Sequence, residues 1–252
     1  MLHVDNDFSL MNFFTSKVSG KELEQQMKNI WRIAYAFSNR YSGQYSWPMR
    51  LSLSGTPLNE SLVCLHQILP KFQRENKLQK VQCVVLTDGE ACPLQYNKWM
   101  ESKYYDAPFY AKRRIDPDRT ILRDRKLGTT YKIEYRYNDF VDTMITNLKD
   151  NFPSVNFIGI RVLSPRDARS FMRLYKDTDK CQVEWLKTKS FCIKSSGYDA
   201  YFGISANALA QDSEFDVKDD ATKAQIKSAF VKSLRVKKLN KKVLGEFISL
   251  VV

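Results

Sequence analysis

The spacing of apolar residues predicts which parts of the chain are helical and which are extended. Apolar side chains recur every three or four positions in four segments, as they do in amphipathic helices. These segments are residues 23–37, 58–69, 140–148 and 168–175. Residues 81–86 and 155–163 are instead near-continuous apolar runs, typical of strands buried on both faces of a parallel sheet. This alternation of helices and strands predicts an α/β fold with a mostly parallel, open sheet and helices on both faces.

Three of the expected helices begin with suitable capping residues. Ser19 and Glu22 have the spacing of a capping box, in which each side chain accepts a hydrogen bond from the other residue's backbone N–H. Thr56 and Ser164 each precede a proline, which suits the first helical position because an N–H there would have no partner. Pro70 is expected to interrupt the second helix near its end.

Two regions depart from the alternating pattern. Residues 92–138 are rich in aromatic and basic side chains, and Leu-Gly-Thr at 127–129 is typical of a turn between two extended arms. We interpret 92–138 as an insertion that contains a hairpin, within a domain that spans residues 1–176. Residues 177–252 form a C-terminal extension with basic amphipathic helices and small strands, expected at 183–186 and 190–194.

The composition is that of a globular protein with a basic surface. The 252 residues are 43% hydrophobic and carry a formal net charge of +12, which favours acidic partners such as nucleic acid or an acidic protein. The five cysteines include no Cys-x-x-Cys pair, so neither a disulfide framework nor a zinc site is expected. No apolar run approaches about 20 residues and no signal-peptide pattern begins the chain. We therefore expect a cytoplasmic protein without membrane partners.

Two short segments carry oxygen donors that suit a magnesium site. Ser-Gly-Thr-Pro-Leu at 54–58 opens a helix, and Leu-Thr-Asp-Gly-Glu at 86–90 ends a strand. In open parallel sheets, ligands bind at the edge where the strands end. The Thr56 hydroxyl and the Asp88 carboxylate are hard donors, and Mg²⁺ takes few protein ligands because it keeps several waters. The sequence therefore predicts Thr56 and Asp88 as ligands of one hydrated Mg²⁺.

These segments resemble the metal-ion-dependent adhesion site of von Willebrand factor A domains. In that family, one loop supplies Asp-x-Ser-x-Ser, a second supplies a threonine, and a third supplies an aspartate that is usually followed by glycine. Gly-Thr-Pro-Leu at 55–58 is similar to the second loop, and Leu-Thr-Asp-Gly at 86–89 to the third. The resemblance covers roughly residues 50–175. It implies a Rossmann-like fold and Mg²⁺-dependent protein binding.

Within that family, the chain resembles the domain at the C-terminal end of the cobaltochelatase large subunit, in the form found in tailed bacteriophages. Ser-Gly-Tyr-Asp-Ala-Tyr-Phe at 196–202 and the lysine-rich tail carry this resemblance. It implies a phage-encoded complex in which the partner is an AAA+ ATPase of the cobaltochelatase type. It also implies the cytoplasm of the bacterial host as the location.

The first metal loop of the family has no full counterpart in this chain. The nearest string is Asp-Asn-Asp-Phe-Ser at 5–9, and the four residues before it are too few for the central strand of a sheet. We expect residue 1 to lie inside a longer parent domain, so that the fold is incomplete at its N-terminus. The alternative is that Asp5, Asp7 and Ser9 form a degenerate first loop.

The leading functional hypothesis is a protein-binding module without independent catalytic activity. Its Mg²⁺ would complete its coordination with a carboxylate of the partner, and Glu90, Arg113 and Arg114 are the residues we expect to contact that partner. Against an independent enzyme, the chain lacks Gly-x-Ser-x-Gly, His-Glu-x-x-His and a phosphate-cradling loop.

Two alternatives stay open. One is a basic protein that binds nucleic acid or a virion and uses the fold as a scaffold, because arginines of the insertion could grip phosphates. Asp116, Asp118 and Asp124 are interleaved with those arginines, which favours self-paired, solvated hairpin faces. The other alternative is a hydrolase or a chelatase component.

Overall fold

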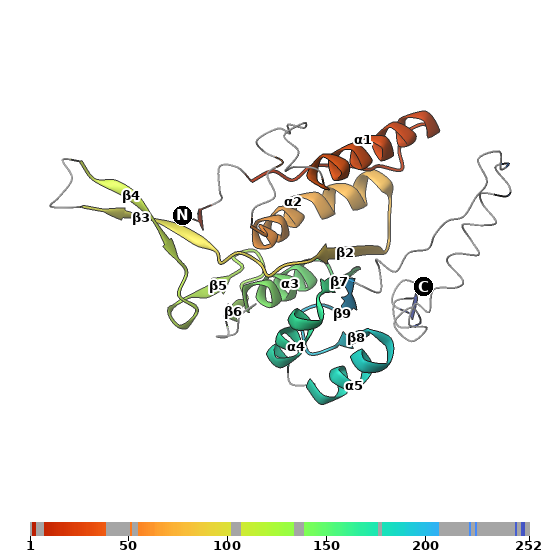
Figure 1. The fold of residues 1–252 in the computed structure, drawn as a ribbon. Coiled ribbons are helices and arrows are strands. Elements are labelled where there is room, and N and C mark those ends of the chain that lie inside the picture. The colour runs from red at the N-terminus through yellow and green to blue at the C-terminus, as the bar shows by residue number, and fades with distance from the viewer. Residues whose placement is uncertain are drawn as a thin grey trace. The chain divides into compact units, whose positions relative to one another are not determined.

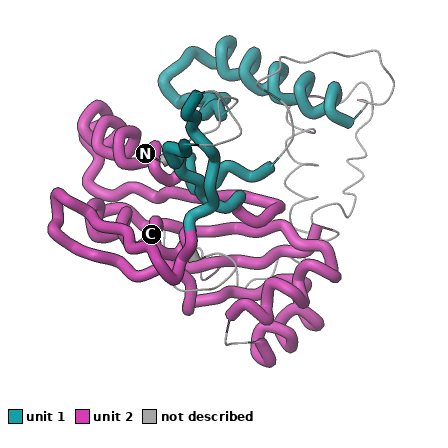
Figure 2. Tube along the Cα trace, turned by 90° about the vertical axis from the view of Figure 1, so that its left-hand side faces the viewer, with its two compact units in different colours: residues 1–61, 92–115 teal, residues 62–91, 116–252 magenta. Residues whose placement is uncertain are grey.

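The computed structural model describes residues 2–3, 8–38, 51, 55–101, 107–133, 139–175 and 178–206, together with the single positions 222, 225, 245, 248 and 249. The chain divides into two compact units, each built from two stretches of sequence (Figure 2). Unit 1 comprises Met1–Ser61 and Cys92–Ile115, and unit 2 comprises Leu62–Ala91 and Asp116–Val252.

A four-stranded mixed sheet lies at the centre of unit 2. β2 pairs with β7 and β7 with β9 in parallel, whereas β8 runs antiparallel to β9. Helices flank this sheet, so the predicted α/β fold is confirmed and is compatible with a Rossmann-like architecture (Figure 1). In order across the sheet, the strands are β2 (Val81–Thr87), β7 (Val155–Leu163), β9 (Ala200–Ser205) and β8 (Ser190–Ile193).

The two apolar runs of the sequence are the neighbouring parallel strands β2 and β7, as predicted. Val81 pairs with Val155 at one end of the ladder and Thr87 with Arg161 at the other. β2 is less buried than predicted, because Val84 is 46% exposed and Leu86 is 68% exposed. Val84 and Leu86 are two positions apart and therefore lie on the same face of β2, which is the incompletely covered one.

The helices α3 (Asp139–Asn151) and α4 (Pro165–Leu174) come before and after β7 and bury the residues that the periodicity selected, except Phe140, which is half-buried. The Ser164 side chain caps α4 by accepting a hydrogen bond from the Asp167 N–H, and Pro165 takes the first helical position. Phe171 packs edge-on against Tyr201 of β9, with ring centroids 5.0 Å apart. The buried side chains at this level are Val141, Met144, Ile145, Leu148, Ala168, Phe171, Met172 and Tyr175.

The segment after α4 is partly different from the prediction. Residues 183–186 were expected to form a strand, but they belong to the helix α5 (Thr178–Thr188). Cys181 and Trp185 are buried and four residues apart, which places both on one helical face. Trp185 packs against Phe191 of β8, with ring centroids 5.8 Å apart. The strand prediction for 183–186 is therefore wrong, and the one for 190–194 is confirmed by β8.

β8 and β9 also bear on the division into domains. Both strands follow residue 176, yet they complete the sheet that β2 and β7 begin. The boundary predicted between residues 176 and 177 therefore falls inside unit 2. The basic helices predicted for the tail lie outside the described residues, apart from a few single positions.

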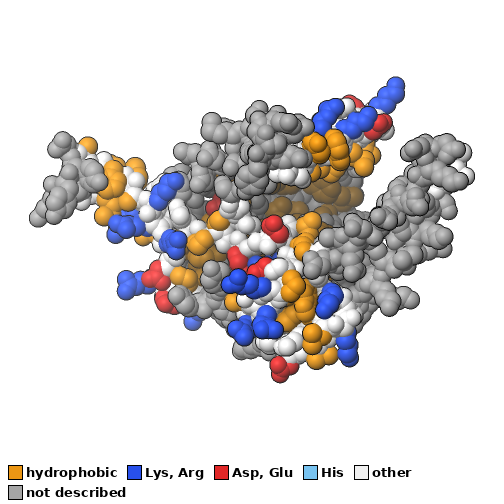
Figure 3. All heavy atoms as spheres, in the orientation of Figure 1, with side chains coloured by type: hydrophobic (Ala, Val, Ile, Leu, Met, Phe, Trp, Pro, Cys, Tyr) orange, Lys and Arg blue, Asp and Glu red, His pale blue; other side chains and the backbone are white. Residues whose placement is uncertain are grey.

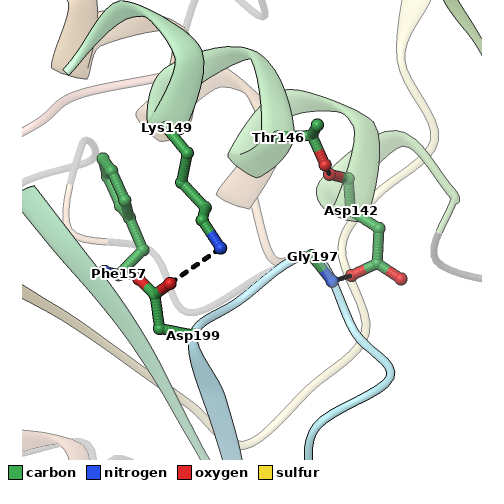
Figure 4. A network of polar contacts seen from close by, with 6 residues as sticks. All are labelled: Asp142, Thr146, Lys149, Phe157, Gly197 and Asp199. Carbon is green, nitrogen blue, oxygen red and sulfur yellow. Dashed lines mark hydrogen bonds and ion pairs between the residues drawn. The ribbon is translucent and has the colours of Figure 1, made fainter. Parts of the chain in front are cut away.

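Polar contacts hold the loop before β9 against α3 and β7 (Figure 4). The Asp142 carboxylate accepts a hydrogen bond from the Gly197 N–H at 2.9 Å, and Lys149 forms an ion pair with Asp199 at 2.7 Å. Asp199 also accepts from the Phe157 N–H at 2.7 Å. Gly197 permits the close approach, because a Cβ at this position would lie 2.6 Å from the Asp142 carbonyl oxygen. These contacts fix the start of β9 beside β7.

Unit 1 contains α1 (Gly20–Ser38) and the beginning of α2 (Leu58–Asn76), which continues into unit 2. The capping box before α1 is confirmed: the Ser19 N–H donates to the Glu22 carboxylate at 2.9 Å, and the Glu22 N–H donates to the Ser19 hydroxyl at 3.3 Å. The expectation that Pro70 interrupts α2 is wrong, because the helix passes through Pro70 to Asn76. A proline removes one helical hydrogen bond, and the buried Leu69, directly before Pro70, anchors this part of the helix.

The insertion at 92–138 contains two hairpins, and one of them was predicted. β5 (Ile121–Arg123) and β6 (Thr130–Lys132) form the predicted hairpin in unit 2, with Gly128 at φ +72° in its turn. A short 3₁₀ helix, η3 (Pro117–Arg119), precedes it. The second hairpin, in unit 1, joins β3 (Gln95–Met100) and β4 (Phe109–Arg114), and β1 (Leu2–His3) pairs with β3.

Candidate functional site

The carboxyl ends of β2 and β7 form the edge at which the sequence placed a ligand site. These two strands are parallel, so their carboxyl ends lie at the same edge of the sheet. β2 ends at Thr87, whose hydroxyl donates to the Gly89 carbonyl at 3.0 Å and accepts from the Gly89 N–H at 3.2 Å. Asp88 is exposed within this tight turn. Its carboxylate is therefore presented to solvent from a turn that its neighbours close.

An internal ion pair fastens the end of the same loop. Arg161 of β7 is paired with Glu90, with 2.5 Å between Nη1 and Oε1, and the two side chains are 6% and 29% exposed. The Arg161 guanidinium also lies over the Phe171 ring, 4.8 Å from its centroid. A buried charge is costly unless it is paired, so this contact ties the loop after β2 to β7. Within the described residues, Glu90 Oε2 and Arg161 Nε are buried without a hydrogen-bond partner.

Two buried tyrosines, Tyr175 and Tyr201, lie near the charge of Glu90, and a third, Tyr198, packs against Tyr201 with ring centroids 4.8 Å apart. Burial raises the pKa of Tyr201 to about 12, while the charge of Arg161 and a hydrogen bond from it act in the opposite direction. Burial also raises the pKa of Tyr175 and of Tyr198, and the nearby charge of Asp142 adds to both shifts. These phenols stay protonated at neutral pH and serve as neutral hydrogen-bonding and packing groups.

The two predicted metal ligands belong to different units. Thr56 is half-buried in unit 1, where its N–H donates to Cys92 Sγ at 3.2 Å and its carbonyl accepts from the Cys92 N–H at 2.9 Å. Asp88 is exposed in unit 2. Neither the Thr56 hydroxyl nor the Asp88 carboxylate is hydrogen-bonded or ion-paired to another described residue. Their convergence on one ion stays a prediction.

Asp88 is the predicted ligand that the structure describes at this edge of unit 2. In the described part of the chain, no three His, Cys, Asp or Glu side chains group as metal ligands would. One carboxylate is compatible with Mg²⁺, which keeps several of its waters. Of the degenerate first loop, Asp5 and Asp7 lie outside the described residues. Ser9 is described, and its buried hydroxyl has no hydrogen-bond partner there.

The three residues predicted to contact a partner lie in two different settings. Glu90 forms the internal ion pair with Arg161, whereas Arg113 and Arg114 are exposed on β4. Sequence reasoning missed Arg161 and Tyr201. A lone arginine within the apolar run 155–163 is the signal for the first, because a charge in a buried strand needs a partner.

No protein-family model, curated protein or solved structure matches this chain. The von Willebrand factor A resemblance and its metal site therefore stay predictions. None of the helices in the described part of the chain is long and apolar enough to cross a membrane.

Proposed function

We propose that this chain is a Mg²⁺-dependent protein-binding module that acts in the cytoplasm, with an AAA+ ATPase of the cobaltochelatase type as its partner. The observation that supports the proposal best is the setting of Asp88. Its exposed carboxylate follows the carboxyl end of β2, in a turn closed by the Thr87 hydroxyl and followed by the Glu90–Arg161 ion pair. A ligand held on a rigid support loses little conformational freedom when it binds an ion.

In this proposal, Asp88 of unit 2 is the principal protein ligand of the ion. A bound Mg²⁺ would offer an open coordination position to a carboxylate of the partner. The chain supplies the fixed carboxylate and, through its net charge of +12, a favourable approach for an acidic surface. Catalytic chemistry is not required of any residue in this scheme.

Metal binding can be tested without the partner by using Mn²⁺ in place of Mg²⁺. Water proton relaxation measures Mn²⁺ bound to the full chain, to Asp88→Asn and to the matched control Asp118→Asn, which changes an exposed aspartate of η3. We expect Asp88→Asn to weaken Mn²⁺ binding at least about tenfold without lowering the melting temperature. Equal binding by both variants would contradict the assignment of Asp88.

The partner is tested in a second arm with the purified ATPase. The immobilised chain should capture the ATPase in Mg²⁺, lose it in a chelator, and capture it poorly when Asp88 is replaced by Asn. Capture that is indifferent to the chelator and to the substitution would remove the metal-dependent mechanism. Mn²⁺ binding without capture of the ATPase would keep the metal site and reject the proposed partner.

A further inference from the structure

The β3–β4 ribbon of unit 1 concentrates basic and aromatic side chains. Each strand has six residues, Gln95–Met100 and Phe109–Arg114, and neither contains an aspartate or a glutamate. The two strands instead carry the cations Lys98, Lys112, Arg113 and Arg114 and the aromatic residues Tyr96, Trp99, Phe109 and Tyr110. Hydrophobic and basic side chains lie together on the visible side of this ribbon (Figure 3).

The strand register gathers four of these side chains on one face. Trp99 pairs with Tyr110, the neighbouring position of the same face pairs Asn97 with Lys112, and the next pairs Gln95 with Arg114. Paired residues of an antiparallel ladder point to the same side, and successive residues alternate. Trp99, Tyr110, Lys112 and Arg114 therefore share one side of the ribbon, which we name the Trp99 face.

The Trp99 face is open to solvent. Trp99 is 50% exposed and Tyr110 is 67% exposed, and their rings meet edge-to-face with centroids 4.8 Å apart. Lys112 and Arg114 are exposed, and neither forms an ion pair with a described residue. A cross-strand aromatic contact stabilises a ribbon by at most about 1 kcal/mol. That contact accounts for the pairing of the rings but not for two cations on the same face that form no ion pair with a described residue.

The described acidic residues of the insertion are not paired with the cations of this face. Glu101, which directly follows β3, is exposed and forms no ion pair with a described residue. Asp116 lies beside Arg119 in η3, 3.6 Å from its guanidinium, and Asp124 accepts hydrogen bonds from Asn147 and Asn151 of α3. Both aspartates belong to unit 2. The interleaving of acids and arginines in the sequence therefore does not reflect pairing within β3–β4.

We propose that the Trp99 face binds single-stranded nucleic acid, with bases stacked on Trp99 and Tyr110 and phosphates contacted by Lys112 and Arg114. Exposed aromatic rings accept unstacked bases of any sequence, and nearby cations follow the backbone. A duplex keeps its bases stacked on one another, and an acidic peptide offers carboxylates without flat rings. The combination of rings and cations therefore favours a single strand over both, and this role is independent of the proposed metal-dependent binding.

Fluorescence anisotropy with the full chain tests the proposal. The probes are a labelled single-stranded RNA of mixed sequence about 16 nucleotides long, a DNA strand of the same sequence, and the duplex. We expect both single strands to bind more tightly than the duplex, and the ratio of the RNA and DNA affinities identifies the preferred strand. Wild-type chain that binds neither single strand, or that binds the duplex equally well, would overturn the proposal.

Matched variants separate stacking from charge. Trp99→Ala with Tyr110→Ala should weaken binding at least about tenfold, because each stacked base contributes about 1–3 kcal/mol, and Trp99→Phe with Tyr110→Phe should recover most of the loss. Lys112→Gln with Arg114→Gln should weaken binding, whereas Arg123→Gln with Arg125→Gln, which removes two exposed cations from the other hairpin, should change it by less than about twofold. Circular dichroism shows that the variants remain folded.

Two results would reject the Trp99 face. Equal losses from both pairs of cation substitutions, with no effect of the aromatic ones, would mean that the basic surface attracts the strand without a defined site. Binding of polyglutamate as tight as that of RNA, lost through the same substitutions, would assign the face to an acidic protein.

Discussion

The β3–β4 ribbon and the β5–β6 hairpin follow one another in the chain, and both are rich in basic residues. They differ in whether their charged and aromatic side chains contact the rest of their unit. In β3–β4, four cations and three exposed aromatic rings lie without an acidic residue in either strand. In the β5–β6 hairpin, the acidic and aromatic side chains are engaged in contacts within unit 2. The basic and aromatic side chains of the first hairpin are exposed to solvent, whereas the acidic and aromatic side chains of the second attach it to the rest of unit 2.

Asp124 and Tyr131 attach the β5–β6 hairpin to α3 through hydrogen bonds. The Asp124 carboxylate accepts from the side-chain amides of Asn151 at 2.7 Å and Asn147 at 2.8 Å, and from the backbone N–H groups of two turn residues, Lys126 and Leu127. These hydrogen bonds, that of Asn151 first, hold the pKa of Asp124 well below its usual range. Tyr131 donates to Asp150 of α3 at 2.6 Å. The hairpin is thus fastened to α3.

Charged residues that are close together in the sequence need not form ion pairs with one another in the structure. Asp116, Asp118 and Asp124 alternate with arginines along the insertion, which suggested one self-neutralised surface. The chain passes from unit 1 to unit 2 at residue 115, so that the acids and the β4 cations belong to different units. The mixed acidic and basic pattern of residues 92–138 as a whole therefore does not show how the charges of either hairpin are paired.

The largest expected effect is on the stability of unit 2. Asp124→Ala removes the acceptor for two partly buried amides and two backbone donors, so we expect the unfolding free energy to fall by about 2 kcal/mol. Lys112→Ala, in the other hairpin, should change it by less than about 0.5 kcal/mol. Urea denaturation measures both. Equal losses from the two substitutions would remove the distinction between the hairpins.

The second effect is a pH dependence. The folded pKa of Asp124 lies below its unfolded value of about 3.9, so its contribution to stability is complete above that value and is lost as the pH falls through the folded pKa. The gap in unfolding free energy between wild type and Asp124→Asn should narrow as the pH is lowered from about 6 towards about 2. Asp118→Asn is the control. A gap for Asp124 that stays constant with pH would contradict its hydrogen-bonded role.

A smaller effect is expected from single hydroxyl groups. Tyr131→Phe removes the hydrogen bond to Asp150 and should lower the unfolding free energy by about 1 kcal/mol. Tyr110→Phe keeps the ring of the Trp99 face and should leave stability nearly unchanged. Thermal or urea melts of the two variants give the comparison, and a loss from Tyr110→Phe as large as that from Tyr131→Phe would contradict it.

The smallest effect concerns the salt dependence of nucleic-acid binding. Each phosphate contact to a single strand contributes about 0.7 to the slope of log affinity against log salt. Lys112→Gln with Arg114→Gln should therefore reduce that slope by about 1.4, and Arg123→Gln with Arg125→Gln should leave it unchanged. Anisotropy titrations at several salt concentrations measure the slopes. The reverse ranking of the two pairs would place the phosphates on β5–β6.

Local patterns predicted most of the sheet and helices of unit 2. Apolar periodicity is decisive where a helix buries one stripe, as in α3, and a serine before a proline located the start of α4. The pattern failed in α5, because Val183 and Trp185, a β-branched and an aromatic residue two positions apart, also fit a short strand. Trp185 packs against Phe191 of β8, and a contact with a separate element cannot be predicted from the residues of α5 alone.

The candidate site was predictable only in part, for a similar reason. The turn after β2 and the exposed Asp88 follow from a strand that ends in Thr-Asp-Gly. The Glu90–Arg161 ion pair joins residues 71 positions apart, and one sequence does not show which distant charges meet. The β3–β4 ribbon was missed because its strands lack the regular alternation of apolar and polar residues that marks a half-buried strand.

Photo-crosslinking tests the contrast between the two hairpins most directly. A single-stranded RNA substituted with 5-iodouridine forms covalent bonds to aromatic side chains stacked on its bases, and mass spectrometry of the digested complex identifies the residues. We predict crosslinks at Trp99 and Tyr110, and their disappearance when Lys112 and Arg114 are both replaced by Gln. Crosslinks confined to Tyr131 or to other parts of unit 2, with β3–β4 unmodified, would contradict the account.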